Sequence, residues 1–244
     1  MKINILAIAA HPDDIELSCS GTLAKHKKLG YTIGIVDLTK GELGSRGTAE
    51  IRQQESAKAA AILQLDVREN LGFNDGFFKN DEVHQLALIR AIRTYKPDIV
   101  LANAPNDRHP DHGRASLLVK EACFLSGLIK INTELNGLPQ EAWRPKKIFN
   151  YIQDLYIEPD FILDISDEFE IKMQSIKAYE SQFYSHTFEG PQTYIASEEF
   201  LNTIAYRSRM MGKKIGVNYG EGFLSIHNHL GLHDFSSVIL PEFV

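Results

Sequence analysis

The sequence has few cysteines, no excess of basic residues and no long apolar run, and each absence excludes a class of protein. Cys19 and Cys123 are the only cysteines among 244 residues, too few for a disulfide framework, so we expect two buried thiols in a reducing cytoplasm. The formal net charge of -6 argues against nucleic acid as a partner, because nucleic-acid-binding proteins usually carry a basic stripe. Nothing approaches the ~20 apolar residues that cross a bilayer, so we expect no membrane partner.

Signals for targeting and for domain boundaries are also missing. The apolar start of the chain resembles a secretory signal only superficially, because Asn4 interrupts it and a charged turn follows in place of a cleavage site. No linker, low-complexity tract or internal repeat divides the sequence. We therefore expect one domain over residues 1–244, a length within the range of a single α/β unit.

The sequence does contain an alternation of apolar runs and helix-forming segments. Residues 3–10 are almost continuously apolar, as in a strand buried on both faces of a parallel sheet. The predicted strands are 3–10, 32–39, 66–73 and 98–105, and the predicted helices are 15–31, 48–65, 82–95 and 114–128. This order favours a Rossmann-like three-layer α/β fold with a mainly parallel sheet flanked by helices.

The second half of the sequence is less regular. Its predicted elements are strands at 146–155 and 160–166 and helices at 168–183 and 198–214. Ser166 or Asp167 is expected to cap the first of these helices, and Ser197 the second. The glycine-rich segment 216–231 is predicted to be a loop that covers a site or forms a subunit contact.

Both His-Pro dipeptides of the chain follow predicted buried strands. "HPDD" at 11–14 follows the first strand, and "HPDH" at 109–112 lies in a predicted loop, 106–113, after the fourth. Ligands of an open parallel sheet bind beyond the carboxyl ends of its strands, where the strand order reverses. We therefore expect the two His-Pro loops to converge on one site.

The residue types in the two loops suit a divalent cation such as Zn²⁺. The same imidazole and carboxylate ligands also accept Fe²⁺, Co²⁺ or Mn²⁺. The lack of cysteine ligands favours a catalytic site with an open position over a closed structural site. For one loop alone the alternative is a turn whose aspartate caps the next helix, but two such loops at equivalent places favour the metal.

At these residues the sequence resembles the LmbE-like, or PIG-L, family of zinc-dependent N-acetylglucosamine deacetylases. The resemblance covers most of the chain and rests on "AAHPDD.E", "TKGELGSRGTAEIRQQE", "NDRHPDHGRA" and "YGEGF". Within the family the sequence is most similar to the bacillithiol-biosynthesis branch, which removes acetyl from N-acetylglucosaminyl malate. The resemblance implies one zinc ion per subunit, a small-molecule aminosugar conjugate as substrate, and a homo-oligomer, either a trimer or a hexamer.

The resemblance also implies roles for the loop residues. Asp13 would be the general base for the attacking water, and His109 would stabilise the tetrahedral oxyanion or protonate the leaving amine, with Asp111 tuning its charge. Zinc can lower the pKa of bound water to about 7, and a carboxylate next to a ligand is placed to accept its proton. The implied zinc ligands are His11, Asp14 and His112.

Two arginines are candidate substrate ligands. Arg52 matches a family arginine that faces the substrate, where a guanidinium can bind sugar hydroxyls or a carboxylate such as that of malate. The alternative is an ion pair on the helix surface with Glu50 or Glu55. Arg108, beside the second motif, is a candidate carboxylate ligand, or else part of a structural ion pair.

The sequence departs from the family at one position. Some relatives carry a tyrosine two residues before the second-motif histidine to polarise the acetyl carbonyl, whereas this sequence has Asp107 there. Tyr194 resembles a mobile-loop tyrosine of the bacillithiol branch; the alternative is a partly buried surface aromatic. Glu221, in "YGEGF", is expected to help build the sugar pocket.

The expected function is zinc-dependent hydrolysis of the N-acetyl group of an N-acetylglucosamine conjugate, with N-acetylglucosaminyl malate as the substrate. One alternative is another metal-dependent hydrolase, such as a phosphoesterase, for which "TKGELGSRGT" is a weak phosphate-binding candidate. A second alternative is a non-catalytic sugar-binding homologue. The presence of Asp13 beside the ligand Asp14 argues against it, because a binding protein has less need of the extra carboxylate.

Overall fold

A seven-stranded sheet forms the centre of the computed structural model, which describes residues 1–226, 230–231 and 234. The strands are β1 Ile5–Ala9, β2 Ile33–Thr39, β3 Val67–Phe73, β4 Ile99–Ala102, β7 Lys147–Tyr151, β8 Phe161–Asp164 and β9 Gly220–Ser225, in the order β3-β2-β1-β4-β7-β9-β8. Strands β3, β2, β1, β4 and β7 pair in parallel, and β9 pairs antiparallel with β7 and β8. The predicted, mainly parallel α/β architecture is confirmed.

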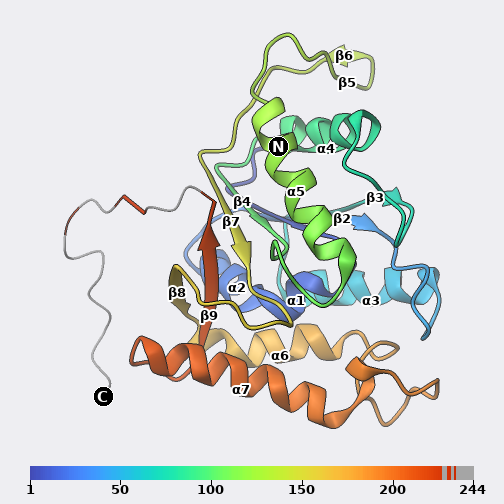
Figure 1. The fold of residues 1–244 in the computed structure, drawn as a ribbon, viewed down its shortest axis with the longest axis vertical. Coiled ribbons are helices and arrows are strands. Elements are labelled where there is room, and N and C mark those ends of the chain that lie inside the picture. Colours follow the sequence, from blue (N-terminus) through green and yellow to red (C-terminus); the bar gives the residue numbers. More distant parts are fainter. Residues whose placement is uncertain (227–229, 232–233, 235–244) are drawn as a thin grey trace.

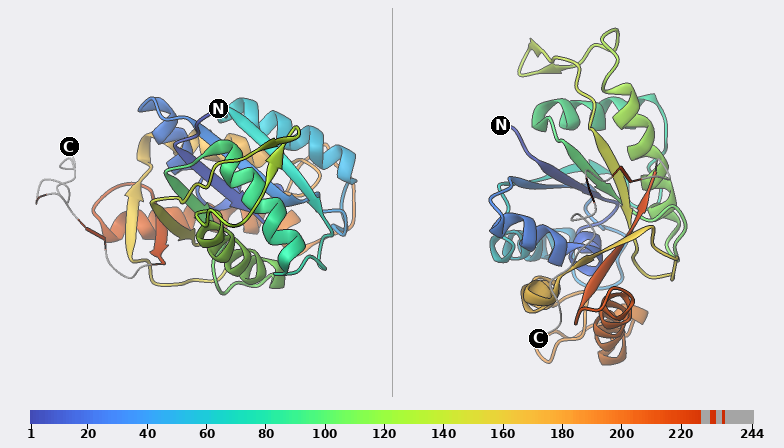
Figure 2. Two further views of the ribbon diagram at one scale, coloured as in Figure 1. Left: turned by 90° about the horizontal axis from the view of Figure 1, so that it is seen from above. Right: turned by 90° about the vertical axis from the view of Figure 1, so that its left-hand side faces the viewer.

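Helices lie on either side of this sheet (Figures 1 and 2). They are α1 Asp14–Ser18, α2 Ser20–Lys28, α3 Ala49–Ile62, α4 Glu82–Tyr95, α5 Pro110–Leu125, α6 Phe169–Lys177 and α7 Glu198–Lys214, with short 3-10 helices η1 Ser166–Glu168 and η2 Tyr194–Ala196. Helices α4 and α5 pack together on one face, while α6 packs on α1, α2 and α3, and α7 packs along β9. A hairpin, β5 Glu134–Leu135 and β6 Leu138–Pro139, projects at the end of the molecule opposite α6 and α7 (Figure 1).

Strand β1 is buried along its whole length because it lies inside the sheet and helices cover both of its faces. Leu6 and Ile8 belong to the apolar cluster beneath α4 and α5, whereas Ile5 and Ala7 belong to the cluster on the α1 and α2 side. This placement explains the nearly unbroken apolar run in the sequence. Both cysteines are buried free thiols, as predicted. No described helix is both long and apolar enough to cross a membrane.

Two helices begin or end differently from the prediction. The segment predicted as one helix over 15–31 is divided at Cys19 into α1 and α2. Helix α5 begins at Pro110, inside the predicted loop 106–113, because proline fits the first turn of a helix and the His109 side chain accepts a hydrogen bond from the Asp111 N–H. Asp111 and His112 therefore lie on the first turn of α5.

The prediction of a loop over 216–231 was wrong for its central part, which forms β9; residues 227–229 lie outside the described residues. The glycines in this segment suggested a loop, but in the structure they let β9 pack closely against its neighbours. A Cβ atom on Gly220 would lie 2.7 Å from Cγ2 of Ile162 on the neighbouring strand, so the strand needs glycine there. Sheet pairing, which depends on distant residues, overrides the local signal.

The capping predictions had mixed outcomes. Ser197 caps α7 by accepting the N–H of Phe200, as predicted. Helix α6 has no side-chain cap, because the 3-10 helix η1 leads directly into it. The hydroxyl of Ser166 instead donates to the Asp164 carboxylate.

A buried ion pair joins β9 to the helices on one side of the sheet. The Lys172 ammonium on α6 lies 2.8 Å from the Glu221 carboxylate, and both side chains are at most 2% exposed. Glu221 also accepts the backbone N–H groups of Gly21 and Thr22 at the start of α2. Its carboxylate is therefore fully engaged inside the protein.

We expect Lys172→Met to lower the free energy of unfolding by about 3–5 kcal/mol, because it leaves the Glu221 charge buried without its partner. The double variant Lys172→Met with Glu221→Gln should recover part of this loss, since it removes both charges. Urea unfolding of the single and double variants measures the difference. Lys214→Met, which removes the exposed partner of Glu158, is the control and should change stability little. Equal losses in Lys172→Met and Lys214→Met would contradict the prediction.

Candidate active site

The two His-Pro loops meet at the carboxyl ends of β1 and β4. These strands are adjacent and parallel, and the strand order reverses between them, with β2 on one side and β7 on the other. The ring centroid of His11 lies 4.6 Å from that of His109 and 5.6 Å from that of His112. The convergence expected from the sequence is therefore present.

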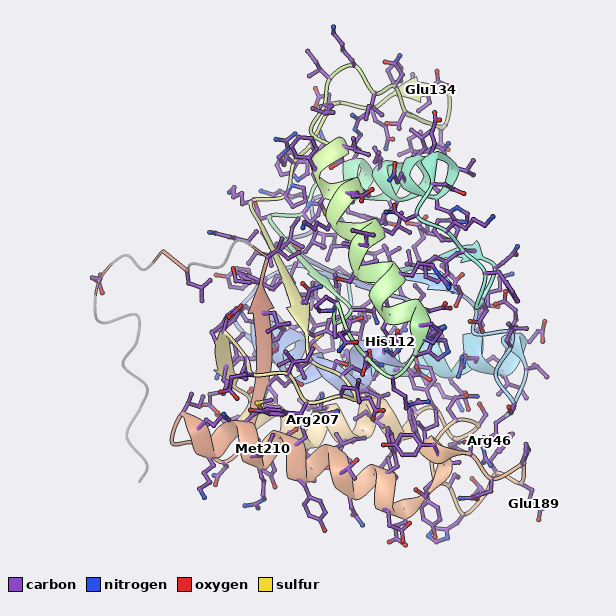
Figure 3. The ribbon with its side chains drawn as sticks, in the orientation of Figure 1. Arg46, His112, Glu134, Glu189, Arg207 and Met210 are labelled. Atoms are coloured by element: carbon purple, nitrogen blue, oxygen red, sulfur yellow. The ribbon has the colours of Figure 1, made fainter. Side chains whose placement is uncertain are left out.

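A cavity of about 300 Å³ lies over these three rings. Residues from both loops, from the segment 43–46 and from α7 line it, and Figure 3 shows His112 and Arg207 among its surrounding side chains. The predicted site residues that line the cavity are His11, Asp13, Asp14, Arg52, Arg108, His109, His112 and Tyr194. Asp111 lies behind the cavity wall, and Glu221 lies in the buried ion pair with Lys172. Glu221 is thus not part of this cavity, contrary to the expectation that it builds the sugar pocket.

The carboxylate of Asp14 faces two of the imidazoles. Its Oδ1 lies 3.2 Å from Nε2 of His112, and its Oδ2 lies 3.7 Å from Nδ1 of His11. Burial acts to raise the pKa of Asp14, but the charges and hydrogen bonds of His112 and His11 outweigh it and hold the pKa well below its usual value. Asp14 is therefore an anion placed between two imidazole nitrogens.

The other ring nitrogen of each of these histidines contacts carboxylate. Nδ1 of His112 lies 2.6 Å from Asp107, and Nε2 of His11 lies 3.1 Å from Asp75 and 3.2 Å from Asp111. Carboxylates in this position fix the tautomer and orientation of metal-binding histidines. The inward nitrogens of His11 and His112 are thereby directed at Asp14.

Sequence reasoning missed the contributions of Asp75 and Asp107. Asp75 follows β3, so its position behind a third strand end was an available signal. Asp107 was noted only as a departure from the family tyrosine. Besides His112, it accepts the backbone N–H groups of Asp154 and Leu155, the latter at 2.8 Å. At this position the chain uses a carboxylate to hold a histidine rather than a phenol facing the cavity.

His109 is half-buried and has a defined tautomer when neutral. Its Nδ1 accepts the N–H of Asp111, so the proton of the neutral ring lies on Nε2. Burial and the neighbouring rings of His11 and His112 lower the pKa of His109, while Asp111 raises it by a smaller amount. The Asp111 carboxylate itself bonds His11, the Gly76 N–H and Arg114, so its influence on His109 is only electrostatic.

Asp13 combines an unusual backbone with a perturbed carboxyl group. Its φ of 110° is a rare conformation for a residue other than glycine, of the kind found at functional sites. Burial raises the pKa of Asp13 to about 7, although the Arg52 guanidinium, 3.3 Å away, acts to lower it. Asp13 therefore has the pKa of a general base working near neutral pH.

Arg52 is buried beside Asp13 and also donates to the Gly41 carbonyl and the Gln182 side chain. The alternative of a surface pair with Glu50 or Glu55 was wrong, because α3 turns Arg52 inward. Its contact with Asp13 gives it an electrostatic role in the site.

The outer wall of the cavity is more exposed. Arg108 pairs with Asp154 at 2.8 Å, and its guanidinium carbon lies 4.9 Å from the centroid of the Tyr194 ring. The Tyr194 hydroxyl lies 3.3 Å from the same Asp154 carboxylate. Arg108 thus forms the structural pair considered from the sequence, while both side chains still line the cavity.

The family of the chain follows from comparison with known proteins. The family model PIG-L, described as GlcNAc-PI de-N-acetylase, matches residues 6–123. Diacetylchitobiose deacetylase of Thermococcus kodakarensis is 30% identical over 230 residues, covering 89% of this chain and 81% of that protein. The chain belongs to the PIG-L, or LmbE-like, family. The family model and this relative are both described as deacetylases, which hydrolyse amide bonds, and the chain is an enzyme.

Two further similarities extend over most of the chain. The probable N-acetyl-alpha-D-glucosaminyl L-malate deacetylase 2 of Bacillus subtilis is 26% identical over 199 residues, covering 75% of this chain and 84% of that protein. The conserved protein TT1542 from Thermus thermophilus is 37% identical, with a TM-score of 0.83, covering 95% of this chain and 98% of that one. The similarity to these two proteins thus covers 75% and 95% of the chain.

We expect Asp107→Asn to lower the pKa of His112 by about one unit. Burial acts to lower this pKa, but the charge of Asp14 and the hydrogen bond that His112 donates to Asp107 raise it to about 9. Replacing the Asp107 carboxylate should therefore lower the pKa of His112. Histidine NMR titration of the metal-free protein measures the change. Asp167→Asn, at an exposed position, should leave the pKa unchanged, and an unchanged value in Asp107→Asn would refute the assignment.

Proposed function

We propose that the protein is a zinc-dependent N-deacetylase that hydrolyses the acetamide of an N-acetylglucosamine conjugate, with N-acetylglucosaminyl malate as its substrate. The observation that carries the proposal is the buried Asp13 carboxyl, with a pKa of about 7, next to an Asp14 anion that faces two imidazoles. The deacetylase relatives support this chemistry. We further propose that the chain is a single-domain cytoplasmic protein that forms a trimer or hexamer.

The proposed metal ligands are His11, Asp14 and His112. Their chemistry fits a divalent cation, because two imidazole nitrogens face one carboxylate while carboxylates hold the opposite ring nitrogens. Among the described residues, ligand atoms that lie within 4.8 Å of one another form two groups, one of His11, His109 and His112 and the other of His11, Asp75 and Asp111. When bound, zinc would act as a Lewis acid and lower the pKa of water; Fe²⁺, Co²⁺ and Mn²⁺ suit the same ligands.

The side chains around this centre would then divide the proton transfers. Asp13 accepts the proton of the attacking water, and Arg52 keeps the pKa of Asp13 from rising further. His109, neutral and protonated on Nε2, donates a hydrogen bond to the oxyanion that forms from the acetyl carbonyl. Asp13, now protonated, can return its proton to the leaving amine. In this scheme Asp13 acts first as the base and then as the acid, and His109 stabilises the oxyanion.

Three further residues are proposed to contact the substrate. Arg52, Arg108 and Tyr194 all line the cavity beside the histidines. Tyr194 would polarise the acetyl carbonyl, since Asp107 holds His112 instead.

A phosphoesterase is disfavoured by the loop "TKGELGSRGT". A phosphate-binding loop needs free backbone N–H groups, but several N–H groups here already donate within the protein. Leu43 donates to Asp75, Gly41 to Thr39, and Gly44 to the Gly41 carbonyl.

The proposed activity predicts that zinc-reconstituted protein releases acetate from N-acetylglucosaminyl malate faster than from free N-acetylglucosamine, and releases no phosphate from sugar phosphates. Chelation should abolish acetate release, and added zinc should restore it. A coupled acetate assay and a phosphate assay on the same preparation measure both activities. Phosphate release without acetate release would replace this proposal with the phosphoesterase, and metal binding without turnover would favour the sugar-binding homologue.

Asp13→Asn is expected to lower kcat by ~10² or more, because the amide cannot accept the proton of water. Zinc content, measured by atomic absorption, should stay at one ion per subunit, since Asp13 is not a proposed ligand. His112→Ala is the matched comparison and should lose both zinc and activity. Full activity in Asp13→Asn would exclude Asp13 as the base.

A further inference from the structure

Four arginines line the cavity, and they differ in how their guanidinium groups are used. They are Arg46, Arg52, Arg108 and Arg207. A guanidinium withdrawn from water needs hydrogen-bond acceptors, and preferably a carboxylate, to offset its lost hydration. An arginine whose donors lack such partners inside the protein is therefore the best candidate to bind an anion from outside.

Three of the four arginines are already engaged. Arg46 donates to the carbonyl oxygens of Ser181 at 2.7 Å and Pro191 at 2.8 Å, so it ties the segment 43–46 to the loop after α6. Arg52 contacts the Asp13 carboxylate, and Arg108 contacts that of Asp154. Arg46 and Arg52 thus each use two guanidinium nitrogens inside the protein, and the charge of Arg108 is met by the Asp154 carboxylate.

Arg207, on α7, is different. Its Nη2 donates to the Leu17 carbonyl at 3.2 Å, and within the described part of the chain no carboxylate lies within 4.0 Å of its guanidinium. The Arg207 side chain is nonetheless half-buried, and this burial lowers its pKa. The charges of Asp154 and Asp107 act to raise the pKa, but without a direct contact. A positive charge is thus held in the cavity wall without a direct counter-ion.

The outer wall of the cavity carries a net positive charge. Arg46, Arg108 and Arg207 contribute three cations, and Asp154 is the single carboxylate that faces them among the described lining residues outside the histidine centre. Arg108 lies beside His109 in the loop after β4, Arg46 lies between β2 and α3, and Arg207 lies on α7, so the positive wall begins at the reaction centre and extends to α7 (Figure 3). A substrate spanning both would place an uncharged sugar amide at one and an anion at the other.

We propose that Arg207 binds an anionic group, a carboxylate or a phosphate, on the aglycone of the substrate. This inference rests on the proposed deacetylation of an N-acetylglucosamine conjugate. Since N-acetylglucosamine itself is uncharged, the anion must belong to the group attached to it. Among the described residues, Nε and Nη1 of Arg207 have no hydrogen-bond acceptor, and such a pair of donors suits the paired oxygens of a carboxylate or phosphate. Arg207 is then a specificity residue that selects charged conjugates over neutral glycosides.

The test compares Arg207→Gln and Arg207→Lys with Arg209→Gln, a matched control on the exposed side of the same helix, where Arg209 lies over the Tyr219 ring. Three substrates are used: N-acetylglucosaminyl malate, N-acetylglucosamine 1-phosphate and the neutral methyl glycoside of N-acetylglucosamine. In Arg207→Gln the ratio of kcat/KM for the preferred anionic substrate over the methyl glycoside should fall about tenfold or more. Arg207→Lys should recover part of this ratio, and Arg209→Gln should keep the wild-type ratio. The anionic substrate with the larger fall identifies carboxylate or phosphate as the group bound.

A binding measurement separates this proposal from the proposed function. Calorimetry with L-malate and with inorganic phosphate requires no turnover, and binding of one of them should weaken about tenfold in Arg207→Gln but not in Arg209→Gln. If the wild type deacetylates none of the substrates, yet Arg207→Gln binds the anion more weakly than the wild type does, the anion site stands and the deacetylase proposal fails. Unchanged substrate ratios together with unchanged anion binding would overturn the proposal and leave Arg207 a packing role at Leu17. An equal loss on charged and neutral substrates, with unchanged anion binding, would overturn it as well.

Discussion

The site depends on the complete burial of β1 in the interior of the sheet. Because both faces of this strand are covered, the chain can expose polar groups only where the strand ends, at His11. Parallel pairing with β4 then brings the second His-Pro segment to the same edge of the sheet. The reversal of strand order between β1 and β4 leaves space there for a ligand. The apolar packing of β1 and its pairing with β4 therefore determine where the polar side chains of the site can gather.

The sequence was sufficient to predict the features that depend on local pattern. The apolar run of β1, the cap at Ser197 and the meeting of the two His-Pro segments all follow from periodicity or from the general behaviour of parallel sheets. It was insufficient for β9, because a short glycine-rich strand is defined by its partners β7 and β8. For the same reason Glu221, on that strand, was assigned to the cavity although it pairs with Lys172.

Within the site, the residues nearest the histidines in the chain were easier to predict than the residues nearest in space. Asp14 and Asp13 are next to each other in "HPDD", yet burial and the neighbouring charges move their pKa values in opposite directions. The pKa of Asp13 rises because burial outweighs the charge of Arg52, on α3, whereas the pKa of Asp14 falls because His112, on α5, and His11 outweigh burial. Likewise, Asp75 comes from the end of β3 and Arg207 from α7, so no spacing rule links either residue to His11. The opposite pKa shifts of the two aspartates are therefore a property of the assembled sheet edge.

The three hydrogen bonds accepted by Asp107 connect the reaction centre to a surface segment. The Asp107 carboxylate accepts a hydrogen bond from the ring of His112. It also accepts the N–H groups of Asp154 and Leu155, in the backbone that follows β7. The same segment carries the Asp154 side chain, which meets Arg108 and Tyr194 at the cavity mouth. A displacement of the backbone at residues 154 and 155 would stretch hydrogen bonds to the same carboxylate that orients His112. The geometry of the imidazole is therefore mechanically coupled to that of the cavity mouth.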